Sequence, residues 1–267
     1  MPRLPYTQAG YHTPSRPITG LANTFPLMTF YSTFIATIVK AGLRVKQHRY
    51  TTWEWCRSSL NVLSALERIG VCFEITGFKH LEQLDTPCVV VGNHMSTLET
   101  VVLPGLILPI QRVAFIVKDT LLNYPIFGDV LRAIQPIVVK RTNPRQDFKT
   151  VMRQGCDRLR RGISIIVFPQ TTRFLNFNPS QFNTLGVKLA LRANVPIVPL
   201  ALLTDAWRNG TYVKDIGPID PSKKVFFAFG KPLWPQGRGK EEHHKMLAFI
   251  QRKFEAWQTG NRAYALE

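Results

Sequence analysis

The sequence predicts an α/β fold in which a mostly parallel sheet is flanked by helices. From Val71 onward, short runs of β-branched and aromatic residues alternate with longer amphipathic stretches, which is typical of a sheet with helices on its faces. The chain has 267 residues, 45% of them hydrophobic, so it can bury one large core. No internal repeat or low-complexity linker interrupts the alternation, and we expect one α/β domain with an N-terminal helical extension.

The expected strands are short apolar runs bounded by Pro, Gly or polar residues, and the expected helices carry apolar residues at helical spacing. The strands cover residues 72–75, 88–91, 113–117, 136–139, 164–168, 197–201 and 224–229. The helices cover residues 97–109, 144–161, 182–193 and 240–257, with shorter ones around 119–133. Because strands joined through helices pair in parallel, their carboxyl ends should meet at one edge, where open α/β sheets bind ligands.

The residues before this alternation divide into two parts. Residues 1–22 are polar and rich in Pro and Gly, without the apolar core of a signal peptide, so we expect an irregular arm. Residues 23–70 predict two helices, although no stretch reaches the roughly 18 clean apolar residues of a spanning helix. Residues 71–267 form the α/β domain, which we expect to fold without the helical pair.

The helical pair has two interpretations. An apolar aromatic helix followed at once by Arg44, Lys46 and Arg49, and then by an amphipathic helix, is typical of a pair lying in a membrane interface. Alternatively, the pair is an ordinary two-helix subdomain packed on its own core. The sequence favours the interfacial interpretation.

The net charge is +17, from 34 basic and 17 acidic residues, and it indicates a polyanionic partner. The basic residues lie in short groups without a nucleic-acid-binding signature, which favours an anionic membrane surface over nucleic acid. The four cysteines are far apart, as is usual for reduced thiols in the cytosol. We therefore expect a membrane-associated protein, monotopic or peripheral, on the cytoplasmic face, with no nucleic-acid partner.

A histidine and a carboxylate, His94 and Glu99, follow the expected strand over residues 88–91. Five residues span about 500° of a helix, so the two side chains meet only if His94 precedes the helix and Glu99 lies in its first turn. Such a pair is a general base, in which the carboxylate orients the imidazole. The same segment also fits a capping box, with Ser96 as the N-cap and Glu99 reaching back. Both interpretations stay open.

Basic side chains end other expected strands at the same edge of the sheet. They are Lys118, Lys140, Arg141 and Arg173, with hydroxyl groups from Thr171 and Thr172. A guanidinium fork donates two parallel hydrogen bonds to a phosphate or a carboxylate. Together with His94, these cations predict a phosphate-bearing substrate held beside a general base.

Motifs of other enzyme classes are absent from the sequence. The sequence contains no G-x-S-x-G elbow, no Walker A loop and no G-x-G-x-x-G. His243 and His244 are adjacent in an expected helix and point about 100° apart, which favours a solvated face over a metal site. We expect neither a metal nor a resident cofactor.

Four blocks in order resemble the glycerolipid acyltransferases of the lysophosphatidic acid acyltransferase (1-acyl-sn-glycerol-3-phosphate acyltransferase) type. Residues 93–99 resemble the N-H-x-x-x-x-D block of that family, residues 168–173 its F-P-E-G-T-R block and residues 195–199 its V-P-[IV]-x-P block. The family's second block resembles the stretch from Lys118, with Pro and Gly inside it, to Arg141. The N-terminal helical pair also resembles the interfacial membrane motif of that family.

The resemblance implies an O-acyltransferase that moves a fatty acyl group from acyl-CoA or acyl carrier protein to the free hydroxyl of a lysophospholipid. The acceptor that the resemblance favours is lysophosphatidic acid, and the product is then phosphatidic acid. His94 is then the general base and Glu99 its orienting partner. The implied substrate-binding residues are Asn93, Lys118, Arg141, Gln170, Thr171, Thr172 and Arg173.

Two places depart from the family pattern. Glu99 stands where Asp is usual, which keeps the charge and adds a methylene. Gln170 and Thr171 stand where Glu and Gly are usual, while Arg173 is kept. These departures leave alternatives open: another lyso-lipid or a glycerol phosphate as acceptor, or a catalytically inactive protein that binds lipid or membrane.

Overall fold

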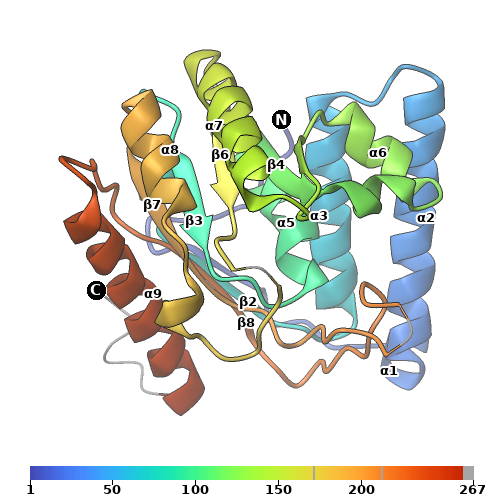
Figure 1. Ribbon diagram of the computed structural model, residues 1–267. Coiled ribbons are helices and arrows are strands. Elements are labelled where there is room, and N and C mark those ends of the chain that lie inside the picture. The colour runs from blue at the N-terminus through green and yellow to red at the C-terminus, as the bar shows by residue number, and fades with distance from the viewer. Residues whose placement is uncertain (171, 212, 261–267) are drawn as a thin grey trace.

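The computed structural model describes residues 1–170, 172–211 and 213–260. Within these residues, eight strands form one sheet in the order β1-β2-β8-β7-β3-β6-β4-β5 (Figure 1). The strands are β1 (Tyr11–His12), β2 (Phe73–Thr76), β3 (Val89–Gly92), β4 (Val113–Lys118), β5 (Ile137–Val139), β6 (Ser164–Val167), β7 (Ile197–Leu203) and β8 (Val225–Phe229). All the strands expected from the sequence are present, and β1 is an addition.

The central strands β7, β3, β6, β4 and β5 run parallel to one another. Strand β8 runs antiparallel to β7, and β2 runs parallel to β8. The expected α/β fold with a mostly parallel sheet is therefore confirmed. Every residue of β3 is buried, as is usual for a parallel strand that helices cover on both faces. The carboxyl ends of the central strands share one edge of the sheet.

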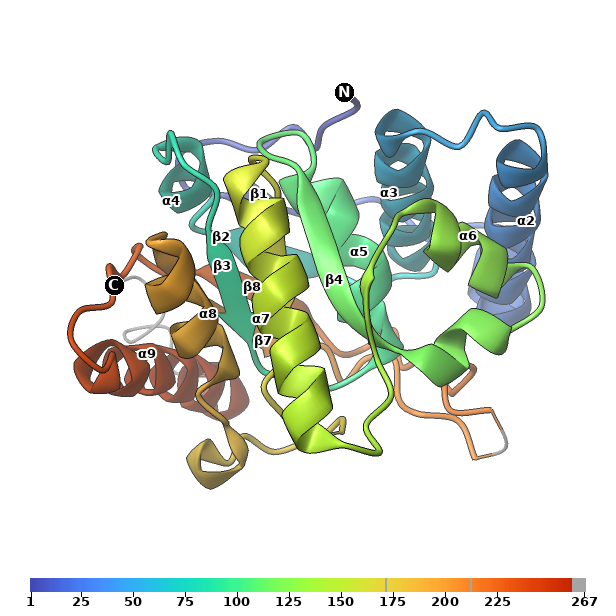
Figure 2. The same cartoon turned by 45° about the horizontal axis from the view of Figure 1, so that its top comes forward.

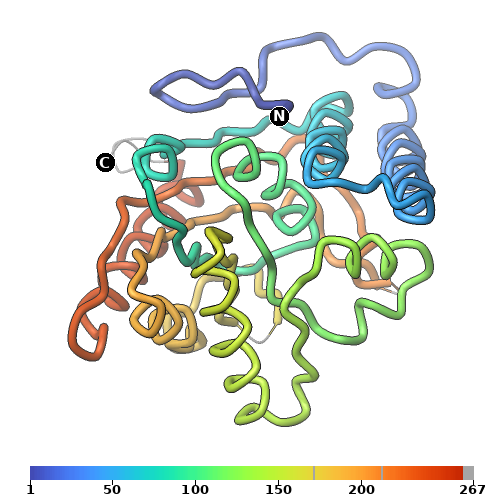
Figure 3. The backbone as a smooth tube through the Cα atoms, turned by 90° about the horizontal axis from the view of Figure 1, so that it is seen from above, coloured from blue at the N-terminus to red at the C-terminus, as the bar shows by residue number. Residues whose placement is uncertain are grey.

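Helices cover both faces of the sheet (Figures 1 and 3). Buried side chains of α2 (Pro26–Lys46), α3 (Thr52–Arg68) and α5 (Thr97–Ile107) form a hydrophobic cluster on one face. Those of α7 (Pro144–Arg160), α8 (Leu185–Ala193) and α9 (Lys240–Thr259) form a second cluster on the other face. The short helices are α1 (Leu21–Thr24), α4 (Lys79–Glu82), α6 (Phe127–Ala133), η1 (Asp119–Asn123) and η2 (Pro179–Gln181).

The N-terminal arm is more ordered than the sequence suggested. Tyr11 and His12 form β1, which pairs antiparallel with β2. The Tyr11 hydroxyl donates a hydrogen bond of 2.6 Å to Glu67 in α3. The expectation of an irregular arm over residues 1–22 is therefore wrong in its middle, because the edge of β2 presents unpaired backbone groups that a further strand satisfies.

The expected helical pair is present as α2 and α3, but it shares a core with the α/β domain. Leu63 of α3 is fully buried in the same cluster as Leu103 of α5 and Val90 of β3. Figure 2 shows α3 lying along α5, so loss of residues 23–70 would expose that layer to water. This shared core argues against the expectation that residues 71–267 fold alone.

Trp207, in the connection between β7 and β8, packs α2 against the rest of the molecule. Its side chain is fully buried. Its ring makes edge-to-face contacts with Phe30 and Phe34 of α2, at centroid distances of 5.0 and 5.2 Å, and with Tyr31 at 6.2 Å. Aromatic pairs of this kind contribute about 0.5–1.5 kcal/mol each beyond the burial of their surface.

We predict that Trp207→Ala lowers the free energy of unfolding by about 3–5 kcal/mol, because it leaves a large cavity between α2 and the sheet. Urea denaturation followed by circular dichroism measures this loss. Trp234→Ala is the matched control, since Trp234 is 48% exposed and its loss should change stability by no more than about 0.5 kcal/mol. Equal losses in the two variants would contradict the role given to Trp207.

Candidate active site

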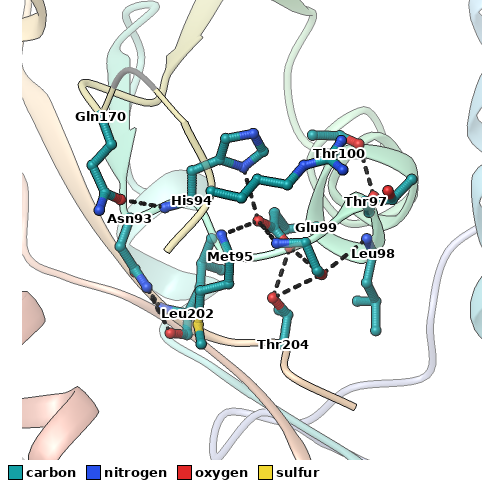
Figure 4. A network of polar contacts seen from close by, with 12 residues as sticks. Asn93, His94, Met95, Thr97, Leu98, Glu99, Thr100, Gln170, Leu202 and Thr204 are labelled. Atoms are coloured by element: carbon teal, nitrogen blue, oxygen red, sulfur yellow. Dashed lines mark hydrogen bonds and ion pairs between the residues drawn. The ribbon is translucent and has the colours of Figure 1, made fainter. Parts of the chain in front are cut away.

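Functional side chains gather where the parallel strands end. His94 follows β3, Lys118 ends β4, Phe168 follows β6 and Thr204 follows β7. Because β3 lies between β6 and β7 in the sheet, the residues that follow these strands meet around His94 (Figure 4). This is the edge at which open α/β sheets bind ligands.

His94 and Glu99 meet as a general-base pair requires. Strand β3 ends at Gly92 and α5 begins after its N-cap, Ser96, so His94 precedes the helix and Glu99 lies in its first turn. The Nδ1 atom of His94 lies 2.9 Å from Oε1 of Glu99 (Figure 4). Ser96 and Glu99 also form the capping box. The two interpretations are therefore compatible, because one carboxylate orients the imidazole and caps the helix.

The Glu99 carboxylate is fully buried and is surrounded by hydrogen-bond donors. Besides His94, the backbone N–H groups of Met95 and Ser96 donate to Oε1, at 2.6 and 2.8 Å. The hydroxyls of Ser96 and Thr204 donate to Oε2, each at 2.7 Å. Burial alone would raise the pKa of Glu99, but the hydrogen bond and charge of His94, followed by the Ser96 and Thr204 bonds, outweigh it and lower the pKa to about 2.

An ionised Glu99 determines which nitrogen of His94 carries the proton. A carboxylate has no proton to donate, so Nδ1–H of His94 is the donor in this pair. Nε2 then carries the lone pair, and Figure 4 shows it on the side of the ring away from Glu99. The ring stacks on Phe168, with 4.6 Å between centroids and 15° between planes. His94 is therefore held in the orientation in which Nε2 accepts a proton.

Asn93 and Gln170 are placed differently from our expectation. Both side chains are only 2% exposed. The Asn93 amide donates to the carbonyl of Leu202 at 2.9 Å and accepts from its N–H at 2.8 Å, which joins the loop after β3 to β7. Gln170 Oε1 accepts from the backbone N–H of His94 at 2.7 Å. Both amides therefore hold the His94 loop through backbone hydrogen bonds, and the substrate contacts expected of Asn93 and Gln170 stay predictions.

The expected cations lie at different distances from His94. Lys118 ends β4, which is two strands from β3 and thus about 10 Å away across the sheet. Lys118 is half-buried, and its ammonium group forms no hydrogen bond or ion pair with the residues that the structure describes. Arg141 follows β5, the edge strand beyond β4, and is exposed. The structure thus brings Lys118, but not Arg141, into the neighbourhood of His94.

Arg173 is engaged by the connection between β7 and β8. Its Nη2 donates to Oδ1 of Asp215 at 2.6 Å, and the two side chains are 12% and 21% exposed. The neighbouring Thr172 hydroxyl accepts from Lys214 Nζ at 3.1 Å. Thr171, expected to contact substrate, lies outside the described residues.

Three residues of this site, Thr204, Phe168 and Asp215, were not among those expected from the sequence. Thr204 directly follows β7, but the strand expected from the sequence ended at residue 201, so the strand-end signal that identified Lys118 did not reach Thr204. Phe168 was part of a recognised motif, but an aromatic residue at a strand end gives no sign that it stacks on a histidine. Asp215 lies 42 residues after Arg173 in an irregular connection, where no spacing rule applies.

The groups at this edge are a base, cations and hydroxyls, which suits removal of a proton from a substrate that carries negative charge. No group of three or more His, Cys, Asp or Glu side chains within residues 1–170, 172–211 and 213–260 is arranged to hold a metal ion.

Comparison with known proteins gives one family and several relatives. Residues 72–203 match the family model described as Acyltransferase. The chain is similar to a 1-acyl-sn-glycerol-3-phosphate acyltransferase of Pseudomonas aeruginosa, with 28% identity over 227 residues that cover 85% of this chain and 80% of the relative. A chloroplastic enzyme of the same name from Brassica napus is 31% identical over 49% of this chain, which spans 37% of that relative.

The fold is also similar to a solved structure. The crystal structure of PlsC, a 1-acyl-sn-glycerophosphate acyltransferase from Thermotoga maritima, superposes with a TM-score of 0.65 over 89% of this chain and 97% of that chain, at 21% identity. At this identity the likeness shows the fold. The superposition extends beyond residues 72–203, which make up about half of the chain.

We predict that Thr204→Val lowers the free energy of unfolding by about 1–3 kcal/mol, because the buried Glu99 carboxylate loses a donor that no water replaces. Chemical denaturation measures the loss. Thr204→Ser is the matched control, since it keeps the hydroxyl that donates to Oε2, and it should recover most of the stability. A Val variant as stable as the wild type would remove Thr204 from the support of Glu99.

Proposed function

We propose that this chain, of which residues 72–203 match the acyltransferase family model, acylates the free hydroxyl of a lysophospholipid, with lysophosphatidic acid converted to phosphatidic acid. The relatives named above carry this activity in their names. The observation that carries the proposal is the 2.9 Å pair of His94 and Glu99 at the carboxyl edge of the sheet, inside the matched residues 72–203. This pair supplies the base that transfer to a hydroxyl requires.

The reaction follows from the orientation of His94. Nε2 takes the proton of the acceptor hydroxyl as its oxygen attacks the carbonyl carbon of the acyl thioester. The imidazolium that forms is stabilised by Glu99, 2.9 Å from Nδ1. When the tetrahedral intermediate collapses, the C–S bond breaks and the leaving sulfur takes the proton from Nε2. The base is restored, and no acyl group becomes attached to the protein.

The acceptor's phosphate is held by the cations of the same edge. Lys118 supports this role best, because its half-buried ammonium group has no protein partner among the described residues. Arg173 supplies a second cation near the His94 loop, since the backbone N–H of Phe174 donates to the His94 carbonyl at 3.0 Å. Fixing the phosphate places the hydroxyl against His94 and makes the transfer effectively unimolecular.

The outer face of α2 supports association with a membrane. Among the described residues, α2 is the one helix long and apolar enough to cross a bilayer, with 21 residues and a mean hydropathy of 1.2. Its inner face packs on α3 and Trp207, so we place it along the membrane surface with its outer face in lipid. That face exposes Met28, Ile35 and Leu43 by 71%, 54% and 53%.

The segment before α6 connects α2 with the site. Ile126, which is 41% exposed, packs against Gly42 of α2, where an added Cβ would lie 2.4 Å from the Ile126 side chain. Tyr124, two residues earlier, is 37% exposed. These exposed apolar side chains lie between α2 and the Arg173 segment, and we propose that a lipid acceptor passes them on its way to His94. We place this surface on the cytoplasmic side, because all four cysteines are free.

A second candidate is a protein that binds lipid without catalysis. Gln170 favours it, since a residue of the third motif differs from the family pattern and is buried in support of the His94 backbone. Because Arg173 is already paired with Asp215, another lyso-lipid and a glycerol phosphate stay alternative acceptors. Direct measurement of acyl transfer separates these candidates.

We predict that the purified protein transfers acyl groups from acyl-CoA or acyl carrier protein to lysophosphatidic acid, and that His94→Ala reduces the rate by about 10²–10⁴-fold. Release of thiol and formation of phosphatidic acid measure the reaction. The mechanism uses a base and fixed cations, so EDTA should leave the rate unchanged. Retention of more than about a hundredth of the activity in His94→Ala would exclude His94 as the general base.

Glu99→Asp is the accompanying variant, because it keeps the charge and shortens the reach to His94. A loss of activity close to that of His94→Ala, with stability largely kept, is expected if the carboxylate orients the imidazole. A loss of stability with activity retained would leave Glu99 as a helix cap alone. Absence of transfer to every acceptor by the wild type would favour the lipid-binding candidate.

We predict that the triple change Met28→Asp, Ile35→Asp and Leu43→Asp abolishes sedimentation with vesicles of phosphatidylcholine and phosphatidylglycerol, because charge on the outer face of α2 cannot enter lipid. These side chains are exposed, so the fold should persist by circular dichroism. Leu175→Asp is the control, since Leu175 is 51% exposed and is not part of α2. Unchanged sedimentation of the triple variant would place the membrane contact elsewhere.

A further inference from the structure

Asp215 forms an ion pair with Arg173, the cation that the family motif contributes to the proposed acceptor site. Its Oδ1 accepts from Arg173 Nη2 at 2.6 Å and from the Thr97 hydroxyl at 3.0 Å. The other terminal nitrogen of Arg173, Nη1, donates to Asn209 Oδ1 at 3.1 Å. Both ends of the guanidinium fork are therefore bound by one irregular connection, between β7 and β8.

The pair lies in a position that is only slightly open to water. Arg173 is 12% exposed and Asp215 is 21% exposed. Thr97 is the first residue of α5, two residues before Glu99, so Asp215 is attached directly to the segment that carries the general-base pair. The carboxylate also lies near Tyr124, whose pKa is raised first by burial and then by Asp215. Asp215 thus stands at the border between the apolar entry and the site.

A carboxylate and a phosphate compete for the same guanidinium. Both are oxyanions that accept parallel hydrogen bonds from the fork, and two anions in contact repel each other when water is largely excluded. Burying the Arg173 guanidinium without a counter-ion would destabilise the fold. An acidic side chain, Asp215, therefore pairs with it when no substrate is bound. A phosphate that binds Arg173 must therefore displace the charge of Asp215 or overcome its repulsion.

We propose, resting on the proposed function, that Asp215 is a positioning residue that sets the affinity for the acceptor's phosphate by standing in its place on Arg173. Its carboxylate keeps the guanidinium aimed at the site while the site is empty. It then yields Arg173 to the incoming phosphate. The affinity for the phosphate is accordingly lower than Arg173 and Lys118 alone would give, while binding of the acyl donor is independent of Asp215.

Asp215→Asn tests this role with little change of shape. The Asn Oδ1 still accepts from Arg173 and from Thr97, so the connection keeps its hydrogen bonds while the competing charge is lost. Asp205→Asn is the matched control. Asp205 lies in the same connection, is 22% exposed, and pairs with Lys223 instead of Arg173. Both variants remove one negative charge from the same segment.

The first measurement is binding of glycerol 3-phosphate by isothermal titration calorimetry. We expect Asp215→Asn to bind it about fivefold more tightly than the wild type, because a neutral hydrogen bond competes less strongly than a charge-assisted one. Asp205→Asn should bind like the wild type. In an Arg173→Gln background, Asp215→Asn should give no gain, because Asp215 acts through Arg173.

The second measurement is the acyl-transfer reaction. We expect Asp215→Asn to lower KM for lysophosphatidic acid by a similar factor, with KM for the acyl donor and KM for the neutral acceptor monoacylglycerol unchanged. A merely structural role would instead lower kcat for all substrates together. If Asp215→Asn fails to fold by circular dichroism, Asp215→Ser carries the same expectations.

Three results would overturn the proposal: equal affinity of wild type and Asp215→Asn for glycerol 3-phosphate, no binding by either, or a gain that persists without Arg173. Failure of the proposed function is a different outcome, namely no acyl transfer by the wild type to any phosphate-bearing acceptor. In that case the calorimetric comparison still decides whether Asp215 and phosphate compete for Arg173.

Discussion

The site depends on one buried carboxylate. Glu99 has no exposed surface, and an ionised group in that position is stable only when donors surround it. Its donors come from the loop after β3, from the helix cap of α5 and from the end of β7, so a single side chain fixes three segments relative to one another. The orientation of His94 is a consequence of this arrangement. The hydrogen bonds that stabilise the buried Glu99 charge also fix the orientation of the His94 ring.

A second constraint is the irregular connection from β7 to β8. At its start, Thr204 donates to Glu99. Trp207 packs beneath α2, and Asp215 holds Arg173. One segment without regular secondary structure therefore links the His94–Glu99 pair, the apolar helix α2 and Arg173. A connection of this kind can adjust the site without disturbing the sheet, because the strands on both sides are held by their own ladders.

Burial explains why the motif residues have such different roles. His94 and Lys118 keep partial access to solvent, and each has a polar group that the protein leaves available. Asn93 and Gln170 belong to the same motifs, yet they are buried and bonded to backbone. Residues of one motif therefore differ in what they contact, since a loop that presents a functional group also needs residues that hold its backbone.

The sequence by itself determined the succession of strands and helices along the chain and the parallel core of the sheet, and it offered His94 and Glu99 as a candidate pair. These follow from local patterns: apolar periodicity, strand ends and a five-residue spacing across a helix start. Only the tertiary structure decided that the α2–α3 pair shares the core of the sheet, that Arg141 lies away from His94, and that Asp215 engages Arg173. Those outcomes depend on strand order and on an irregular connection, which bring together residues far apart in the chain and leave no periodic trace in the sequence.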